Sequence, residues 1–218
     1  MALVSSVQGI TESPLLSILA PDSFFRLFVQ LNYLKQVSRF LFLPGMLFND
    51  TQQWWGTKKR KHPHEGIDIY LTQSDEEGVR NILPQMLIPA ILPGYPVHFH
   101  RDFLGETLYS RHPEISRESA VLHTIYGHGQ FNIDLNSSSS INKGDILGTI
   151  SDPPATSAVP AHLHISCAWI QEDQRTEELN WEDMAAYAIP GSRGIKPSLA
   201  VATNRNVHFI DPLPFLLR

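Results

Sequence analysis

From residue 46 onward, the sequence consists of short apolar runs separated by Gly, Pro, Ser and Asp residues. Short apolar runs between turn-forming residues are typical of β-strands. Their regular punctuation predicts a mainly β fold, an antiparallel sandwich or barrel built from hairpins. The expected strands are residues 67–71, 85–90, 120–125, 146–151, 162–170 and 207–210.

Three further segments complete this prediction. Residues 136–140 are typical of an exposed hairpin tip, and Asn142-Lys143-Gly144-Asp145 is typical of a turn. A short helix is expected near residues 181–187, where Asn180 can cap it.

The N-terminal part of the chain follows a different pattern. Apolar residues between positions 24 and 41 recur at helical spacing, and six polar residues within 24–48 make this stretch too polar to span a bilayer. Asp22 or Ser23 can cap the start, and Pro44-Gly45 can end it. We expect an amphipathic helix packed on the core, with interfacial membrane attachment as the alternative. The organisation is then a helical extension over residues 1–45 and one β domain over residues 46–218.

Charge and cysteine content exclude several classes of protein. The 218 residues carry a net charge of -5, which gives no electrostatic reason to expect nucleic acid as a partner. The single cysteine, Cys167, excludes an intrachain disulfide and a cysteine-based zinc site. The basic run 58–61 is interpreted as a solvated loop, with a positive rim over a peptide-binding cleft as the alternative. No secretory signal is visible at the N-terminus.

Ten histidines carry the chemical information in this sequence, because imidazole both ligates zinc and transfers protons near neutral pH. In the segment His64-Glu65-Gly66-Ile67-Asp68, the carboxylate of Asp68 lies between isoleucines and needs a partner. Gly66 lets the backbone turn sharply, so His64 and Asp68 can converge on one cation. A solvated aspartate at the start of a strand is the alternative.

Two more segments carry paired or flanked histidines. His162-Leu163-His164 lies at the start of an expected strand, where residues two apart project from one face about 6.5–7 Å apart. Either ring can ligate a metal, and His98-Phe99-His100 shows that the pattern alone is not decisive. His128 lies between two glycines, which indicates an open rim or a close backbone approach.

Together, two histidines and one carboxylate make three protein ligands, and such a set leaves the fourth zinc position for water. A zinc ion lowers the pKa of bound water toward about 7, and the remaining histidines can move protons or stabilise an oxyanion. The composition of the set therefore indicates a hydrolytic metal site.

The order His64-x-x-x-Asp68, Tyr126-x-His128, His162-x-His164 resembles the signature of the lysostaphin-type, LytM-like zinc peptidases. Trp54-Trp55-Gly56, residues 142–148 and residues 209–213 are similar to accompanying phrases of that family, so the resemblance covers roughly residues 46–218. It implies a duplicated-hairpin β sandwich, one Zn²⁺, cleavage of peptide cross-links in peptidoglycan, and a periplasmic or extracellular location. It further implies that His64, Asp68 and His164 are metal ligands and that His128 and His162 are catalytic.

Three departures from the family concern the surroundings of the site. Gly129 stands where the family usually has Leu, residues 152–160 replace a Gly/Ser-rich loop, and residues 97–119 are longer than the usual hairpin. These changes put the substrate preference in question, and the alternative function is a non-catalytic module that binds or activates a wall enzyme. A biotinyl- or lipoyl-like carrier is disfavoured, because no exposed modified-lysine turn stands out and the histidines would have no role.

Overall fold

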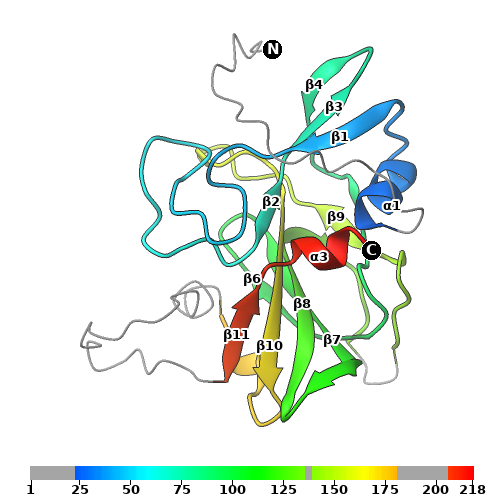
Figure 1. Ribbon diagram of the computed structural model, residues 1–218, viewed down its shortest axis with the longest axis vertical. Coiled ribbons are helices and arrows are strands. Elements are labelled where there is room, and N and C mark those ends of the chain that lie inside the picture. The colour runs from blue at the N-terminus through cyan, green and yellow to red at the C-terminus, as the bar shows by residue number, and fades with distance from the viewer. Residues whose placement is uncertain (1–22, 136–138, 181–205) are drawn as a thin grey trace.

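The computed structural model describes residues 23–135, 139–180 and 206–218, and most of its elements are strands (Figure 1). Every strand pair is antiparallel, so the prediction of a mainly β, antiparallel fold is confirmed. The larger sheet has the order β11-β10-β8-β7-β6, with β2 paired to β10, β9 to β8 and β5 to β9. Its strands are β2 (Ile67–Ile69), β5 (Leu87–Pro89), β6 (Tyr95–Arg101), β7 (Glu106–Arg117), β8 (Ala120–Phe131), β9 (Ile146–Ile150), β10 (Leu163–Gln171) and β11 (Val207–Ile210).

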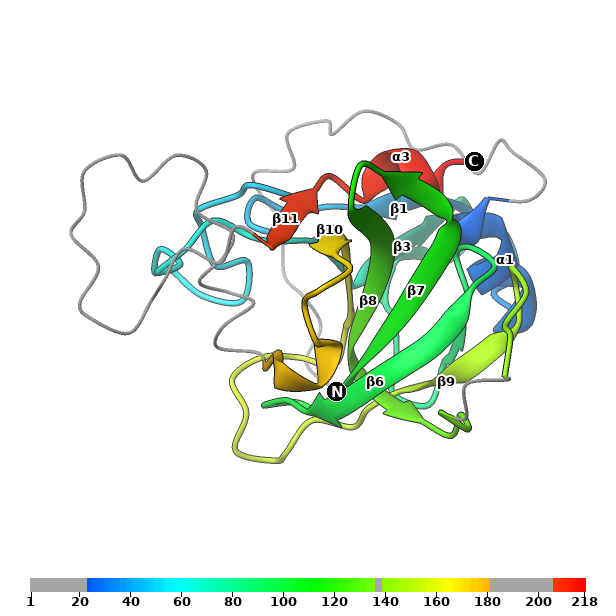
Figure 2. The ribbon, with the colours of Figure 1, turned by 90° about the horizontal axis from the view of Figure 1, so that it is seen from below.

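The two faces of the larger sheet pack in two apolar clusters, because side chains alternate along each strand. On one face, Tyr126 of β8 and Ile165 of β10 join the main core. On the other face, Ile125 and Ala168 of the same strands pack with Phe209 of β11. Figure 2 shows β6, β7 and β8 side by side in this sheet.

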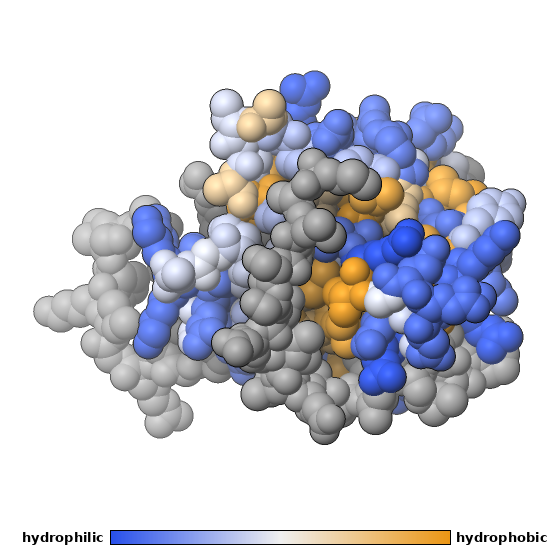
Figure 3. Space-filling model, turned by 90° about the horizontal axis from the view of Figure 1, so that it is seen from above, coloured by the Kyte–Doolittle hydropathy of each residue, from blue (hydrophilic) through white to orange (hydrophobic). Residues whose placement is uncertain are grey.

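A smaller sheet has the order β1-β3-β4, with β1 (Val37–Leu41), β3 (Leu71–Ser74) and β4 (Gly78–Asn81). The strand expected over residues 67–71 is in fact divided between the two sheets, because β2 pairs with β10 whereas β3 pairs with β1. All four residues of β4 are exposed. Seen from above in Figure 3, the described surface is largely hydrophilic, with apolar side chains gathered near its centre.

The N-terminal helix is shorter than the apolar spacing indicates. Helix α1 (Phe24–Leu31) begins at Ser23, whose hydroxyl accepts a hydrogen bond from the backbone N–H of Arg26 at 3.4 Å. Tyr33 and Gln36 then adopt positive φ angles of 51° and 59°, which a helix does not accommodate. The expectation of helix up to residue 41 is therefore wrong, and residues 37–41 form β1.

The segment before residue 45 contacts the segment after it. β1 pairs with β3, and α1 packs against β5. Phe25 and Phe28 of α1 contact the ring of Phe40, with centroids 4.6 and 6.0 Å apart. The C-terminal helix α3 (Leu213–Leu216) also contacts α1. The helix and the β domain therefore share one apolar core.

The structure also contains a long hairpin that the sequence patterns did not predict. β6 and β7 pair with each other, and β7 pairs with β8, so the extended segment 97–119 contributes to an edge strand, β6, and to a central strand, β7. A 3₁₀ turn, η1 (Thr176–Glu178), lies against β6. The turn at residues 142–145 is present, with Gly144 at φ +88°. The helix expected near residues 181–187 and positions 136–138 of the expected hairpin tip lie outside the described residues. Within the described ranges, no helix is long and apolar enough to cross a membrane.

Candidate metal centre

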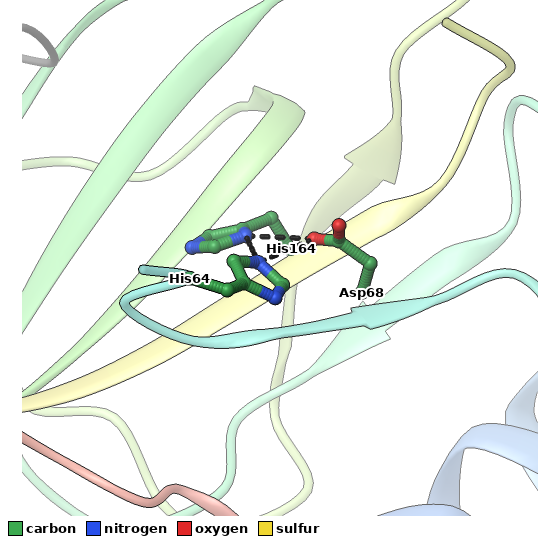
Figure 4. Close-up of side chains that lie close together, drawn as sticks. All are labelled: His64, Asp68 and His164. Atoms are coloured by element: carbon green, nitrogen blue, oxygen red, sulfur yellow. Dashed lines mark hydrogen bonds and ion pairs between the residues drawn. The ribbon is translucent and has the colours of Figure 1, made fainter. Parts of the chain in front are cut away.

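His64, Asp68 and His164 lie together although they are far apart in the sequence (Figure 4). Asp68 of β2 pairs directly with His164 of β10, and His64 lies in the loop that leads into β2. One ligand atom from each residue lies within 4.8 Å of the others, and all three residues are buried. Antiparallel pairing of β2 with β10 is thus what brings the first and last histidine motifs together.

The separations between these ligand atoms are close to those of a tetrahedral zinc site. His64 Nε2 lies 3.2 Å from His164 Nδ1 and 3.2 Å from Asp68 Oδ1, and His164 Nδ1 lies 2.8 Å from Asp68 Oδ1. Ligands about 2.0–2.1 Å from a tetrahedral zinc ion lie about 3.3 Å from one another. Two of the three separations therefore match neighbouring corners of such a tetrahedron, and the third, at 2.8 Å, is a hydrogen-bond distance.

The hydrogen bonds behind the rings determine which nitrogens are free to ligate a metal. His64 Nδ1 lies 3.2 Å from the carbonyl oxygen of Leu47, which can only accept, so Nδ1 carries the proton. His164 Nε2 lies 2.7 Å from the Ser166 hydroxyl, and a proton at Nε2 leaves Nδ1 with a lone pair. Three electron-rich atoms then converge on one point.

Converging lone pairs need a positive charge among them, either a proton or a metal ion. Burial raises the pKa of Asp68, but the charges of His64 and His162 outweigh it and hold that pKa well below its usual range. Burial lowers the pKa of His164, but the hydrogen bond and charge of Asp68 outweigh it and raise that pKa. The donor set, two imidazoles and a carboxylate, fits zinc.

The second carboxylate oxygen of Asp68 is held by two donors that the sequence patterns did not identify. Trp54 Nε1 donates to Asp68 Oδ2 at 2.7 Å, and an Arg60 guanidinium nitrogen donates to the same oxygen at 2.9 Å. Arg60 belongs to the basic run 58–61, in which the three lysines are exposed. The interpretation of a solvated loop therefore holds for the lysines and is wrong for Arg60.

Gly66 is needed for close approach to β10. A Cβ atom at this position would lie 2.3 Å from the carbonyl oxygen of Ile165 and 2.9 Å from Cε1 of His164. Gly66 is not among the positive-φ residues, so the reason is space and not the sharp turn that we expected. The neighbouring Glu65 is buried, with Oε1 3.6 Å from His164 Nε2, on the far side of that ring from the Nδ1 atom.

His128 and His162 lie beside the three-residue cluster. The ring of His162 lies 4.7 Å from that of His128 between centroids, and its Nε2 lies 3.5 Å from Asp68 Oδ1. His162 Nδ1 lies 2.8 Å from the carbonyl oxygen of Pro160, which orients the ring. The five side chains from the three motifs therefore gather in one place, each no more than 3 % exposed.

Asp102 is an additional carboxylate at this site. Its Oδ1 lies 3.1 Å from His128 Nδ1, and its Oδ2 accepts the backbone N–H of His128 at 2.9 Å. Burial raises the pKa of Asp102, but the hydrogen bond and charge of His128 outweigh it and hold that pKa below its usual range. Burial also lowers the pKa of His128 to about 4, against the opposing effect of Asp102. Sequence spacing offers no signal for this pair, because 26 residues separate its members.

The other histidines for which the structure gives contacts take part in packing. His98 and His100 lie on β6 against the ring of Tyr109, on the face of the sheet that carries the second apolar cluster. His112 bridges the carbonyl oxygen of Pro93 and the hydroxyl of Thr124. His123 is buried, with Nδ1 3.0 Å from the carbonyl oxygen of Val121. The Tyr126 hydroxyl accepts the N–H of Ile91, so it holds the backbone and does not face the site.

No protein-family profile and no curated protein matches the sequence. Among solved structures, the chain is similar to a Pseudomonas aeruginosa protein described as a peptidase M23, with 18% identity, 59% of this chain and 48% of that chain covered, and a TM-score of 0.33. It is also similar to lysostaphin in solution, with 15% identity, 64% and 50% covered, and a TM-score of 0.35. The similarity thus spans about half the length of each of these two proteins.

At TM-scores of 0.33 and 0.35, these likenesses carry no argument about the fold or the activity of this chain. The residues of the site, and not the likeness, therefore support a function.

Proposed function

We propose that this protein is a zinc-dependent endopeptidase that hydrolyses peptide bonds in peptidoglycan cross-links. In this proposal His64, Asp68 and His164 hold the metal, and His128 and His162 are the catalytic histidines. The observation that carries it is the convergence of three buried ligand atoms, 2.8–3.2 Å apart, with two further imidazoles beside them.

Three ligands make an open site, and an open site is what distinguishes catalytic from structural zinc. When bound, zinc lowers the pKa of a coordinated water toward about 7 and polarises a substrate carbonyl. The second carboxylate oxygen of Asp68 is occupied by Trp54 and Arg60, which supports ligation through Oδ1 alone.

The two other histidines have complementary hydrogen-bonding states. With its Nδ1 proton donated to Asp102, neutral His128 keeps a lone pair at Nε2, and this nitrogen can accept a proton during hydrolysis. His162 donates its Nδ1 proton to Pro160, and when protonated it also carries a proton at Nε2, near Asp68. That proton can stabilise the oxyanion or be transferred to the departing amine.

The peptidoglycan substrate rests on the order and spacing of the motifs, which resemble those of wall-cleaving peptidases. The same resemblance implies that the proposed activity takes place in the periplasm or outside the cell. A net charge of -5 offers no support for a nucleic-acid substrate.

Metal analysis and peptide digestion test this proposal together. We expect about one zinc per chain in the purified protein and cleavage of defined wall peptides. His128→Ala should abolish cleavage and retain zinc, whereas His164→Ala should lose zinc. Zinc retained in His164→Ala would contradict the ligand assignment.

A second candidate function is a non-catalytic module that binds or activates a wall enzyme. The observation that favours it is burial, because the five site side chains are each no more than 3 % exposed and a substrate must reach them. The rings of Trp54 and Phe103 contact His162 and His128, with centroids 5.1 and 4.8 Å apart. Zinc-loaded protein that binds wall peptides without cleaving them would support this candidate over the peptidase.

A further inference from the structure

Asp102 lies in the connection between β6 and β7, and its side chain is fully buried. Oδ1 accepts the backbone N–H groups of Leu104 and Gly105, both at 2.8 Å, and faces His128 Nδ1. Oδ2 accepts the Thr107 hydroxyl at 2.7 Å and the N–H of His128 at 2.9 Å. Five donors therefore surround one carboxylate, and two of them belong to His128.

His128 has an unusual backbone conformation. Its φ is +64°, in the left-handed region that residues other than glycine rarely adopt. Such a conformation persists only where its surroundings hold it, and it is often found at functional sites. The bond from the His128 N–H to Asp102 Oδ2 fixes this conformation, and the bond from Nδ1 to Oδ1 fixes the ring on the same carboxylate.

We propose that Asp102 is a positioning residue for His128, which holds the ring proton on Nδ1 and the backbone in its left-handed form, so that Nε2 is kept as the proton acceptor. This inference rests on the proposed peptidase function. Asp102 acts through His128, and the five site side chains named above do not include it.

A carboxylate suits this role better than an amide. An ionised carboxylate only accepts hydrogen bonds, so it determines which nitrogen of the facing imidazole carries the proton. Its charge also stabilises the imidazolium that forms when His128 takes up a proton at Nε2. In Asp102→Asn the amide nitrogen has to face either three donors at the Oδ1 position or two at the Oδ2 position.

The Oδ2 position is the easier one for the amide nitrogen, because the Thr107 hydroxyl can rotate and accept. Asp102→Asn therefore keeps an acceptor for His128 Nδ1, but it loses the negative charge and the hydrogen bond from the backbone N–H of His128. We expect the variant to fold and to bind zinc, because the five hydrogen-bond donors around Asp102 come from residues other than the three proposed metal ligands.

The test combines kinetics with nuclear magnetic resonance of the His128 ring in zinc-loaded protein. Asp102→Asn should lower kcat about 10²-fold with little change in KM, since general acid–base groups contribute about 10²- to 10⁴-fold. The proton on His128 Nδ1 should be visible in the wild type, and its resonance should move upfield in Asp102→Asn because the bond is no longer charge-assisted.

Thr124→Val is the matched control, because Thr124 lies on β8 as His128 does. The change removes a buried hydrogen bond between Thr124 and His112 and does not involve Asp102. A loss of kcat of equal size in this control would overturn the proposal, since it would mean that lost stability is the cause. An unchanged kcat and an unmoved Nδ1 proton in Asp102→Asn would also overturn it.

A double-mutant cycle separates positioning from an independent role. Because His128→Ala abolishes cleavage, the cycle is measured on the free energy of unfolding. Asp102→Asn should destabilise the His128→Ala protein less than it destabilises the wild type, because the bond to the His128 ring is already absent. Full additivity would contradict the proposal. If the wild type cleaves no wall peptide, the Nδ1 resonance and its shift still test the positioning role, so a failure of the peptidase function is recognised separately.

Discussion

Replacing Trp54 with Phe removes a single hydrogen-bond donor from the proposed zinc site. The indole N–H of Trp54 donates to Asp68 Oδ2 at 2.7 Å, while its ring packs on Tyr70 and His162 with centroids 4.7 and 5.1 Å away. A phenyl ring keeps most of this packing. The change therefore tests whether a residue behind the ligand controls how the ligand holds the metal.

The expected effect follows from the charge of the acceptor. A hydrogen bond to a charged group contributes about 1.5–3 kcal/mol, and about 1.4 kcal/mol corresponds to a factor of ten in affinity. Arg60 keeps its bond of 2.9 Å to the same oxygen, so Asp68 is not left without a donor. We therefore expect zinc affinity to fall at the lower end of this range, roughly tenfold, within the about 10- to 100-fold typical of such residues.

Competition with a chelating dye of known affinity measures this change. Trp169→Phe is the control, because Trp169 lies on β10 as His164 does but packs against Arg117, away from the metal ligands. Zinc affinity equal to that of the wild type in Trp54→Phe, or an equal loss in Trp169→Phe, would refute this reasoning.

Three further predictions concern stability. Gly66→Ala should destabilise the fold by about 1–3 kcal/mol and weaken zinc binding, because the added Cβ would meet the carbonyl oxygen of Ile165 and the ring of His164. Urea unfolding measures the stability and metal analysis measures the zinc binding. Wild-type values for both would contradict the account. Removing zinc with a chelator should lower Tm by about 10 °C if the metal was present at about a thousand times its Kd, and a calorimetric scan without any shift would argue against a bound metal. Burial lowers the pKa of His123 to about 4, so the neutral ring is the folded form. The contribution of the neutral His123 ring to the free energy of unfolding is complete above about pH 6.5. About 3 kcal/mol of stability is lost as the pH falls from there to about 4, because the unfolded chain takes up the proton more readily. The free energy of unfolding of His123→Gln, measured with urea, should therefore fall less steeply than that of the wild type between about pH 6.5 and 4. The same dependence on pH in both proteins would be inconsistent with this pKa.

Local patterns in the sequence were sufficient to locate most strands of the larger sheet. Alternation in the segment after His162 correctly indicated β10, and the turn at residues 142–145 correctly separated β9 from the preceding segment. The length of β8 was underestimated, because Gly127 and Gly129 resemble a strand end although both lie within the strand. Spacing left His162 and His164 as alternatives for the third ligand. The resemblance to lysostaphin-type peptidases implied that His64, Asp68 and His164 meet, and the β2–β10 pairing accounts for it.

Features that depend on tertiary contacts were not predictable from spacing. The apolar pattern of residues 24–41 fits a helix, but Phe40 packs on Phe25 from a strand, and the turn between them is not encoded in periodicity. The roles of Arg60 and Asp102 were missed for a similar reason. Arg60 donates from a loop to Asp68 on β2, and Asp102 accepts in a loop from His128 on β8. Composition gives no sign of either partner.

The central claim is that three side chains hold one zinc ion with a position left for solvent. Anomalous diffraction at the zinc absorption edge, on crystals of the zinc-loaded protein, tests it most directly. We predict one peak about 2.0–2.2 Å from His64 Nε2, Asp68 Oδ1 and His164 Nδ1, with no fourth protein ligand. A peak bound by other residues, a fourth protein group on the metal, or no peak between these three atoms would contradict the claim.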